Sequence, residues 1–177
     1  MRRMLGLVLG VGLLSTACGE FGTKDAKIPG DELGTFHVVG RMESSTCGPG
    51  ALGSTDVWEF EVKLSRDGRD LYWLNGKEPI YGRLAADGVT FSFDSRSAIT
   101  TRQAHGAAPG CTVVRRDLAS GVLQGSEVVT GFSGALRFGY APTEDSECSD
   151  LVGIDGGFAQ LPCEMGYQLD ADNVSKP

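Results

Sequence analysis

Hydrophobic and polar residues alternate with a period of two over much of this chain. Between Val57 and Leu64 the apolar residues fall on one face of an extended chain, and the charged residues fall on the other. Such alternation is typical of a β-strand with one buried side. It recurs, with interruptions, in segments 36–42, 71–74, 80–84, 89–93, 111–124, 128–140 and 163–169. No segment after residue 18 sustains the 3.6-residue spacing of an amphipathic helix.

Turn signals separate these segments. Asp67-Gly68 and Asp87-Gly88 are tight hairpin sequences, and the chain contains 26 glycines. About eight short strands joined in this way predict an all-β fold, an antiparallel up-and-down meander that forms a small closed or nearly closed barrel. A two-sheet β-sandwich is the alternative. We also expect a bulge or kink near Gly121.

The first eighteen residues have the order of parts of an export signal. Arg2 and Arg3 precede an uncharged apolar run, residues 4–14, which is too short to span a bilayer permanently. The run ends in Ala17-Cys18, which resembles the lipobox of bacterial lipoproteins, although Ser15 stands where that family most often has Leu. The resemblance implies that Cys18 becomes the N-terminus and carries fatty acyl chains such as palmitate. An ordinary cleaved signal is the alternative.

Four regions follow from these patterns. Residues 1–17 are the expected lipoprotein signal peptide, and the polar residues 18–33 are the expected flexible tether. Residues 34–171 are expected to form a single β domain, and residues 172–177 a disordered tail. Cleavage before Cys18 would leave 160 residues, which suffices for one hydrophobic core.

The start of the β domain also carries a weak family signal. Gly34-Thr35-Phe36 is a glycine-x-aromatic sequence at the beginning of the first expected strand. With the strand count, it resembles the calycin or lipocalin type of barrel. Lipocalins usually have Trp at the aromatic position, so the resemblance implies architecture only.

Charge limits the class of partner. After cleavage the chain would carry 14 basic and 23 acidic residues, a net charge of −9. Such a chain repels phosphate backbones, which argues against nucleic-acid binding. It is also repelled by an anionic leaflet, so the lipid on Cys18 would have to hold it to the membrane. We expect a monomer.

The cysteine count supports export. With Cys18 assigned to lipid, four cysteines remain, and an oxidising compartment favours two disulfides. A meander places Cys47, Cys111, Cys148 and Cys163 at one rim of the barrel. We prefer Cys148–Cys163 with Cys47–Cys111, because the first pair closes a short loop. Cys47–Cys163 with Cys111–Cys148 also joins neighbouring strands, and the sequence does not choose between these pairings.

Candidate chemistry is sparse. His37 and His105 are interpreted as ordinary surface histidines, and no cysteine stands at zinc-ligand spacing, so no metal or other cofactor is expected. Ser133 lies in Gly131-Phe132-Ser133-Gly134-Ala135, which lacks the last glycine and the strand–turn–helix context of a nucleophile elbow. We therefore assign no catalytic residue. Arg115 and Asp117 share one face of a strand and Arg116 takes the other. We expect both arginines to reach solvent; the alternative is that one points inward, where it would need a carboxylate partner or would mark a polar ligand group.

These observations favour a non-enzymatic lipoprotein outside the cytoplasm, anchored to the cell envelope and, by preference, to the outer membrane. The leading hypothesis is a small apolar ligand bound in the barrel or at its mouth. An envelope protein with a filled core and interacting loops is the alternative, and a hydrolase ranks last. An interior cavity of roughly 300 Å³ or more would favour the ligand.

Overall fold

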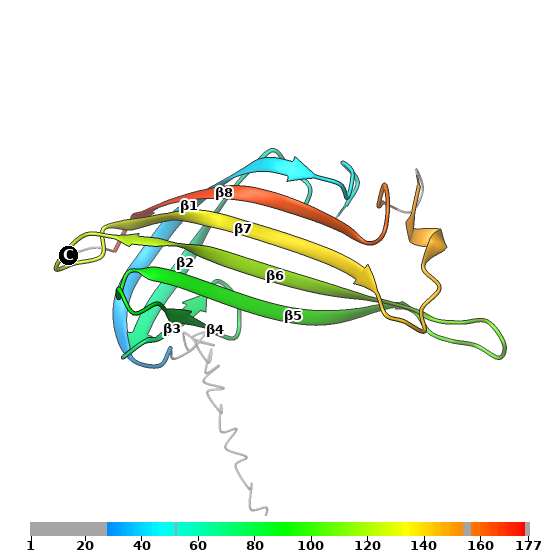
Figure 1. Ribbon diagram of the computed structural model, residues 1–177, viewed down its shortest axis with the longest axis horizontal. Helices are drawn as coiled ribbons and strands as arrows, with labels where there is room; N and C mark the ends of the chain where they lie inside the picture. The colour runs from blue at the N-terminus through cyan, green and yellow to red at the C-terminus, as the bar shows by residue number, and fades with distance from the viewer. Residues whose placement is uncertain (1–27, 52, 154–156, 176–177) are drawn as a thin grey trace, which may run out of the picture.

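The computed structural model describes residues 28–51, 53–153 and 157–175. In this part of the chain, eight antiparallel strands follow one another around a closed barrel, and the last pairs with the first (Figure 1). A single 3-10 turn, η1 (Ser149–Leu151), interrupts the loop before the last strand. The strands are β1 (Asp31–Ser45), β2 (Val57–Asp67), β3 (Asp70–Leu74), β4 (Ile80–Leu84), β5 (Thr90–Arg102), β6 (Cys111–Gln124), β7 (Gly131–Pro142) and β8 (Cys163–Asn173).

The predicted all-β meander is confirmed, and the two-sheet sandwich is wrong. Each strand pairs with its successor in sequence, and β1 pairs with both β2 and β8. Closure leaves no sheet boundary at which two separate layers could face each other. Neighbours in sequence are also neighbours in space, which allows short connections such as the one between β2 and β3, although the connections 46–56 and 143–162 are longer.

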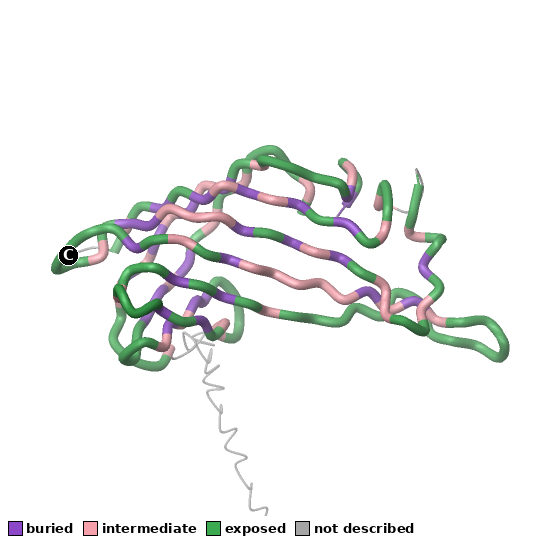
Figure 2. The backbone as a smooth tube through the Cα atoms, in the orientation of Figure 1, coloured by how far each residue is buried: buried purple, intermediate pink, exposed green. Residues whose placement is uncertain are grey.

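The alternating positions place one side of each strand in the core. Figure 2 shows buried residues alternating with exposed or intermediate ones along β8 and the first half of β5. Aromatic rings fill much of the interior, and Phe132 contacts the rings of Phe36, Trp73 and Phe91. The largest fully buried side chains are Tyr167, Phe36, Phe91, Phe132, Leu64, Leu71, Leu84, Met165, Leu169, Val38, Val62 and Cys47.

The bulge predicted near Gly121 is wrong. β6 pairs with β5 and with β7 through Gly121 without a register shift. The glycine is explained by packing instead, because a Cβ atom there would lie 2.7 Å from the Phe91 ring and 2.9 Å from the Gly134 Cα. A side chain at this position would therefore force the two strands or the ring apart.

Strand length is unequal around the barrel. β3 and β4 have five residues each, whereas the other strands have 11 to 15. β4 pairs with β5 only at residues 91–93, and β3 pairs with β2 only at residues 63–67. Among the described residues, the remainder of β2 and of β5 therefore has a strand partner on one side only. The long strands extend well past the β3–β4 hairpin (Figure 1).

The ends of the domain differ from the prediction. β1 begins at Asp31, within the expected tether 18–33, and the Ser65 hydroxyl donates a 2.6 Å hydrogen bond to the Pro29 carbonyl. The expected disordered tail, 172–177, is wrong through residue 175. β8 continues to Asn173, and the Ser175 hydroxyl accepts a 2.6 Å hydrogen bond from the Thr35 amide. The signal peptide, Cys18 and the rest of the tether lie outside the described residues.

The preferred disulfide pairing is wrong, and the competing one is present. Cys47 is bonded to Cys163 and Cys111 to Cys148, with Cα atoms 5.0 and 5.1 Å apart. Adjacent strands decide this pairing. The end of β1 lies beside the start of β8, where the Thr46 amide donates to the Glu164 carbonyl. The chain leaving β7 follows the start of β6, which brings Cys148 to Cys111 rather than to Cys163. The predicted gathering of all four cysteines at one rim is confirmed.

Candidate functional site

A cavity of about 220 Å³ lies inside the barrel, beside the place where the β3–β4 hairpin ends. Its walls come from both sides of the shortened hairpin. Trp58 belongs to β2, Asn75 follows β3, Ile80 begins β4, and Ser95 belongs to β5. The cavity therefore exists because β3 and β4 stop before they can cover the full length of their neighbours.

Four aromatic side chains line the cavity. Trp58, Trp73, Phe93 and Phe138 all line it, and Leu136 adds an aliphatic surface. The Trp73 and Phe93 rings meet edge to face with centroids 5.5 Å apart, and those of Trp58 and Phe138 lie 6.2 Å apart. The chain has two tryptophans, and both line this cavity. Intrinsic tryptophan fluorescence is thus a direct report of what occupies it.

One ion pair interrupts the aromatic wall. Arg115 Nε lies 2.7 Å from Asp117 Oδ1, and the side chains are 28% and 29% exposed. The Arg115 guanidinium also lies over the Phe138 ring, 4.5 Å from its centroid. Burial lowers the pKa of Arg115, but the hydrogen bond to Asp117 and the charge of that carboxylate outweigh burial and raise the pKa above its ordinary value.

Arg115 takes the alternative position, facing inward with a carboxylate partner, and its side chain is 28% exposed. The alternation of β6 places Arg115 and Asp117 with the buried residues Val113 and Ala119 on the inward face. Arg116 points outward, and its Nε and Nη2 atoms donate to the two carboxylate oxygens of Asp94 at 2.9 and 2.6 Å. This outer pair lowers the pKa of Asp94 mainly through the side-chain hydrogen bond. Two Arg–Asp pairs thus lie on opposite faces of one wall.

Polar groups of the cavity retain unused hydrogen-bonding capacity. The Arg115–Asp117 hydrogen bond uses Nε and Oδ1. Within residues 28–51, 53–153 and 157–175, no hydrogen bond engages the Arg115 Nη atoms, Asp117 Oδ2, or the side chains of Ser95 and Asn75. Ser95 lies directly opposite Asp117 in the β5–β6 register. The cavity therefore presents donors and acceptors close to one another on an otherwise apolar surface.

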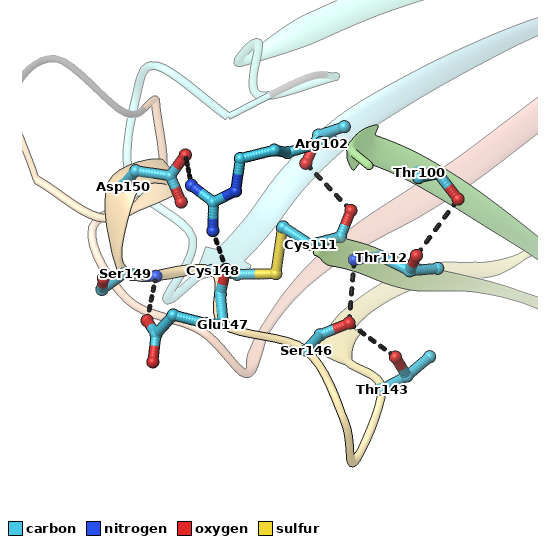
Figure 3. Close-up of a disulfide and its surroundings, with 11 residues drawn as sticks. Thr100, Arg102, Cys111, Thr112, Thr143, Ser146, Glu147, Cys148, Ser149 and Asp150 are labelled. Carbon is cyan, nitrogen blue, oxygen red and sulfur yellow. Dashed lines mark hydrogen bonds and ion pairs between the residues drawn. A yellow bond between two sulfur atoms is a disulfide. The ribbon is translucent and has the colours of Figure 1, made fainter. Parts of the chain in front are cut away.

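The disulfide rim is the second place where the sequence predicted binding. Figure 3 shows the Cys111–Cys148 bond within a network that joins the loop after β7 to β5 and β6. Arg102 donates to Asp150 Oδ2 at 2.7 Å and to the Glu147 carbonyl at 2.5 Å. The Ser146 hydroxyl accepts a 2.9 Å hydrogen bond from the Thr112 amide (Figure 3). These groups satisfy one another, so the network holds the loop in place.

The rim loops also close the far end of the interior. The Phe158 ring packs on Tyr140 with centroids 5.3 Å apart. The Tyr167 hydroxyl donates to the Gly53 carbonyl and accepts a 3.4 Å hydrogen bond from the Thr55 amide. Tyr167 is fully buried beneath these contacts. The gap beside the β3–β4 hairpin, where β2 and β5 have a strand partner on one side only, offers a route by which a small molecule could reach the cavity.

Larger hollows lie on the outer surface. One, of about 540 Å³, is lined by outward residues that include Val114, Arg116 and Gly139. Another, of about 580 Å³, lies near Val128 and Ser175. Both are wide and open to solvent. The interior cavity is smaller, but it alone of the three combines tryptophan rings with a half-buried ion pair, and we take it as the candidate site.

The residues considered for catalysis are not assembled. Ser133 lies on the outward side of β7, and β8 separates it from β1, which carries His37. His37 Nε2 is 3.5 Å from Glu59 Oε2 on the outer surface. His105 lies in the exposed loop between β5 and β6, where its backbone pairs with Ala108. No hydrogen bond of the Ser133 side chain occurs among the described residues.

The cavity was not identified from the sequence. Its aromatic residues belong to the alternating pattern, but the pattern says only that they face inward. Two signals were available in principle: both tryptophans lie at inward positions, and two of the eight segments, 71–74 and 80–84, are markedly short.

Among the described residues, no group of three or more His, Cys, Asp or Glu side chains is arranged to hold a metal ion. Within the same residues, no helix is long and apolar enough to span a membrane.

Comparison of the chain with protein-family models, with curated proteins and with solved structures finds no match.

Proposed function

We propose that this protein is an exported lipoprotein of the cell envelope whose barrel binds a small, largely apolar molecule in its interior. The observation that carries the proposal is the cavity of about 220 Å³ lined by Trp58, Trp73, Phe93 and Phe138. A dry cavity of roughly 150 Å³ holds benzene, whereas sites for drug-sized ligands begin at roughly 300 Å³. The volume of about 220 Å³ is below the roughly 300 Å³ that we set as the mark of a ligand site, so it suits only a small ligand with about one ring.

The location rests on the chain's N-terminus and its cysteines. Ala17-Cys18 after a short apolar run is the sequence expected for lipid attachment, and Arg2-Arg3 supplies the positive charge that precedes such a run. The two disulfides between β1 and β8 and between β6 and the loop after β7 are compatible with an oxidising compartment. The acidic composition argues that lipid, rather than a basic surface, provides the anchor.

Binding fits this site better than turnover. The ionisable side chains that line the cavity are Arg115 and Asp117, and they are bonded to each other. Ser133, considered as a nucleophile, lies on the outer surface of β7. Eight-stranded barrels are just wide enough to hold one small ligand. The arrangement supports recognition without a nucleophile and base in contact.

Tryptophan fluorescence tests the binding proposal. Titration of the purified protein with toluene should change the emission of Trp58 and Trp73, because both side chains line the cavity. Ala119→Leu places a larger side chain in the cavity and should abolish the response. Ala141→Leu makes the same change on the exposed side of β7 and should leave the response intact. Folded wild-type protein whose emission responds neither to toluene nor to benzamide would contradict the proposal.

Lipid attachment is tested separately. Cys18→Ser should move the protein from the membrane fraction to the soluble fraction without changing its far-ultraviolet spectrum, because the described β domain begins at Asp31. Mass spectrometry of the wild-type N-terminal peptide should find acyl chains on Cys18. A Cys18→Ser protein that stays firmly on the membrane would argue against the anchor.

Protein–protein contact through the rim is a second candidate function. The loop residues 143–153 are exposed at many positions and yet held by the Cys111–Cys148 bond and by Arg102 (Figure 3). Fixed loops lose little conformational entropy on binding, which favours interaction. Cross-linking from this loop to a single envelope protein, together with a cavity that takes no small probe, would favour this function over the first.

A further inference from the structure

The Arg115–Asp117 pair determines what kind of molecule the cavity can accept. We propose, resting on the function proposed above, that the ligand is a single-ring aromatic molecule carrying one uncharged polar group that both accepts and donates hydrogen bonds, as a carboxamide does. The ring would lie among the aromatic side chains, and the polar group would meet the ion pair. This class differs from a fatty acyl chain and from an aromatic acid.

The ring is indicated by the shape and chemistry of the wall. Trp73 and Phe93 meet edge to face, and Trp58 and Phe138 approach at a tilt of 47°. Aromatic rings prefer such edge-to-face and tilted neighbours, and a flat ligand ring can continue this pattern. A volume of about 220 Å³ accommodates one ring, whereas a long acyl chain occupies a larger volume than this.

The absence of net charge on the ligand follows from the pair itself. Arg115 and Asp117 lie 2.7 Å apart and both line the cavity, so their charges balance there. A carboxylate placed beside Arg115 would also lie beside Asp117, and attraction and repulsion would largely cancel. The carboxylate would still lose its hydration on entering the cavity. An ammonium group would meet the same cancellation with the signs reversed. A charged ligand therefore gains little electrostatic energy from the pair and loses the free energy of its hydration.

The polar group is indicated by the unused hydrogen-bonding atoms. Among the described residues, the Arg115 Nη donors and the Asp117 Oδ2 acceptor have no partner. A carboxamide oxygen can accept from Arg115, while the amide N–H donates to Asp117. Ser95, opposite Asp117 in the register, supplies a further hydroxyl. A purely apolar ligand would cover these groups and leave them without water or a partner, which costs binding free energy.

The pair is already held in the geometry that this recognition needs. The Arg115 guanidinium is fixed by its bond to Asp117 and by its position 4.5 Å from the centroid of the Phe138 ring. A ligand therefore does not have to order these side chains when it binds. Arg116 of the same strand forms a comparable pair on the outside with Asp94 of β5, and neither residue lines the cavity. The outer pair offers a control of matched chemistry.

Three probes of similar size separate the ligand classes: benzamide, benzoate and toluene. Affinities are measured for the purified protein by tryptophan fluorescence at one pH near 7. Benzamide should bind at least about tenfold more tightly than either of the others. It gains two hydrogen bonds, and no charged group has to move from water into the cavity. In Asp117→Asn, the negative charge is removed, and benzoate should become the tightest of the three. Asp94→Asn should preserve the wild-type order.

The outcomes distinguish this inference from the function on which it rests. Wild-type protein that prefers benzoate, or binds toluene as tightly as benzamide, would overturn the proposed ligand class while still demonstrating a cavity that binds small molecules. An Asp117→Asn protein with the wild-type order would also overturn it. If none of the three probes binds to folded wild-type protein, the binding function fails together with the ligand class.

Discussion

Removing the disulfide between Cys47 and Cys163 should destabilise the barrel more than removing the one between Cys111 and Cys148. The sequence separations are 116 and 37 residues. A cross-link acts largely by restricting the unfolded chain, and its effect grows with the logarithm of loop length. Because the second bridge lies inside the larger loop, it shortens the effective loop to about 80 residues. The expected losses are then about 4.5 and about 3.8 kcal/mol, respectively.

The assay compares two double variants in a Cys18→Ser background, which removes the fifth thiol. One carries Cys47→Ala and Cys163→Ala, and the other carries Cys111→Ala and Cys148→Ala. Urea unfolding followed by tryptophan fluorescence gives the free energy of unfolding of each variant and of the parent. Thiol titration of the denatured proteins should find no free thiol in either variant, because each retains one complete disulfide.

Two results would refute this reasoning. Free thiols in either variant would show that the remaining cysteines are not partners, and the connectivity given by strand adjacency would be wrong. A smaller loss for the Cys47–Cys163 variant would show that loop length does not control the contribution of these bridges. The pairing favoured by the sequence predicts a smaller stabilisation from one of its bridges, because a Cys148–Cys163 disulfide would close about 15 residues and contribute about 3 kcal/mol.

Two further predictions concern glycine packing and acid stability. Gly121→Ala should destabilise the protein by about 1–3 kcal/mol, because its Cβ would press on the Phe91 ring. Gly139→Ala, where no atom lies within 4 Å of the added Cβ, should lower the free energy of unfolding much less. Urea unfolding measures both variants. The free energy of unfolding should fall as pH drops below about 4, since the hydrogen bonds from Thr90 lower the folded-state pKa of Asp87 and protonation then favours the unfolded chain. Asp87→Asn should reduce that fall, and an unchanged slope would contradict this assignment.

The local pattern predicted much of the fold. Alternation in segments such as 57–64 and 163–169 identifies strands and the face that each buries, because side-chain direction in an extended chain depends only on position parity. Short turns such as Asp67-Gly68 then make consecutive strands antiparallel neighbours. Eight such strands predicted the closed meander, and the meander placed the cysteines at one rim.

The candidate site lay beyond this reasoning. The odd or even position of a residue along the strand correctly groups Arg115 with Asp117, but it does not say whether that face of the strand meets solvent or the aromatic side chains of the interior. The answer depends on Phe138 across the β6–β7 pair and on Trp58 across the barrel. It also depends on where β3 and β4 end, because their shortness leaves the cavity beside the hairpin. These are relations between residues far apart in the chain.

The sequence by itself determined which segments are extended, which side of each is apolar, and that the order of strands is a simple meander. These properties come from neighbouring residues, whose alternation acts within a single strand. Only the tertiary structure decided the disulfide partners, the inward position of the Arg115–Asp117 pair and the volume left between the rings. The reason is physical: each of these depends on the distance between strands after closure, and closure brings together residues that no local period relates.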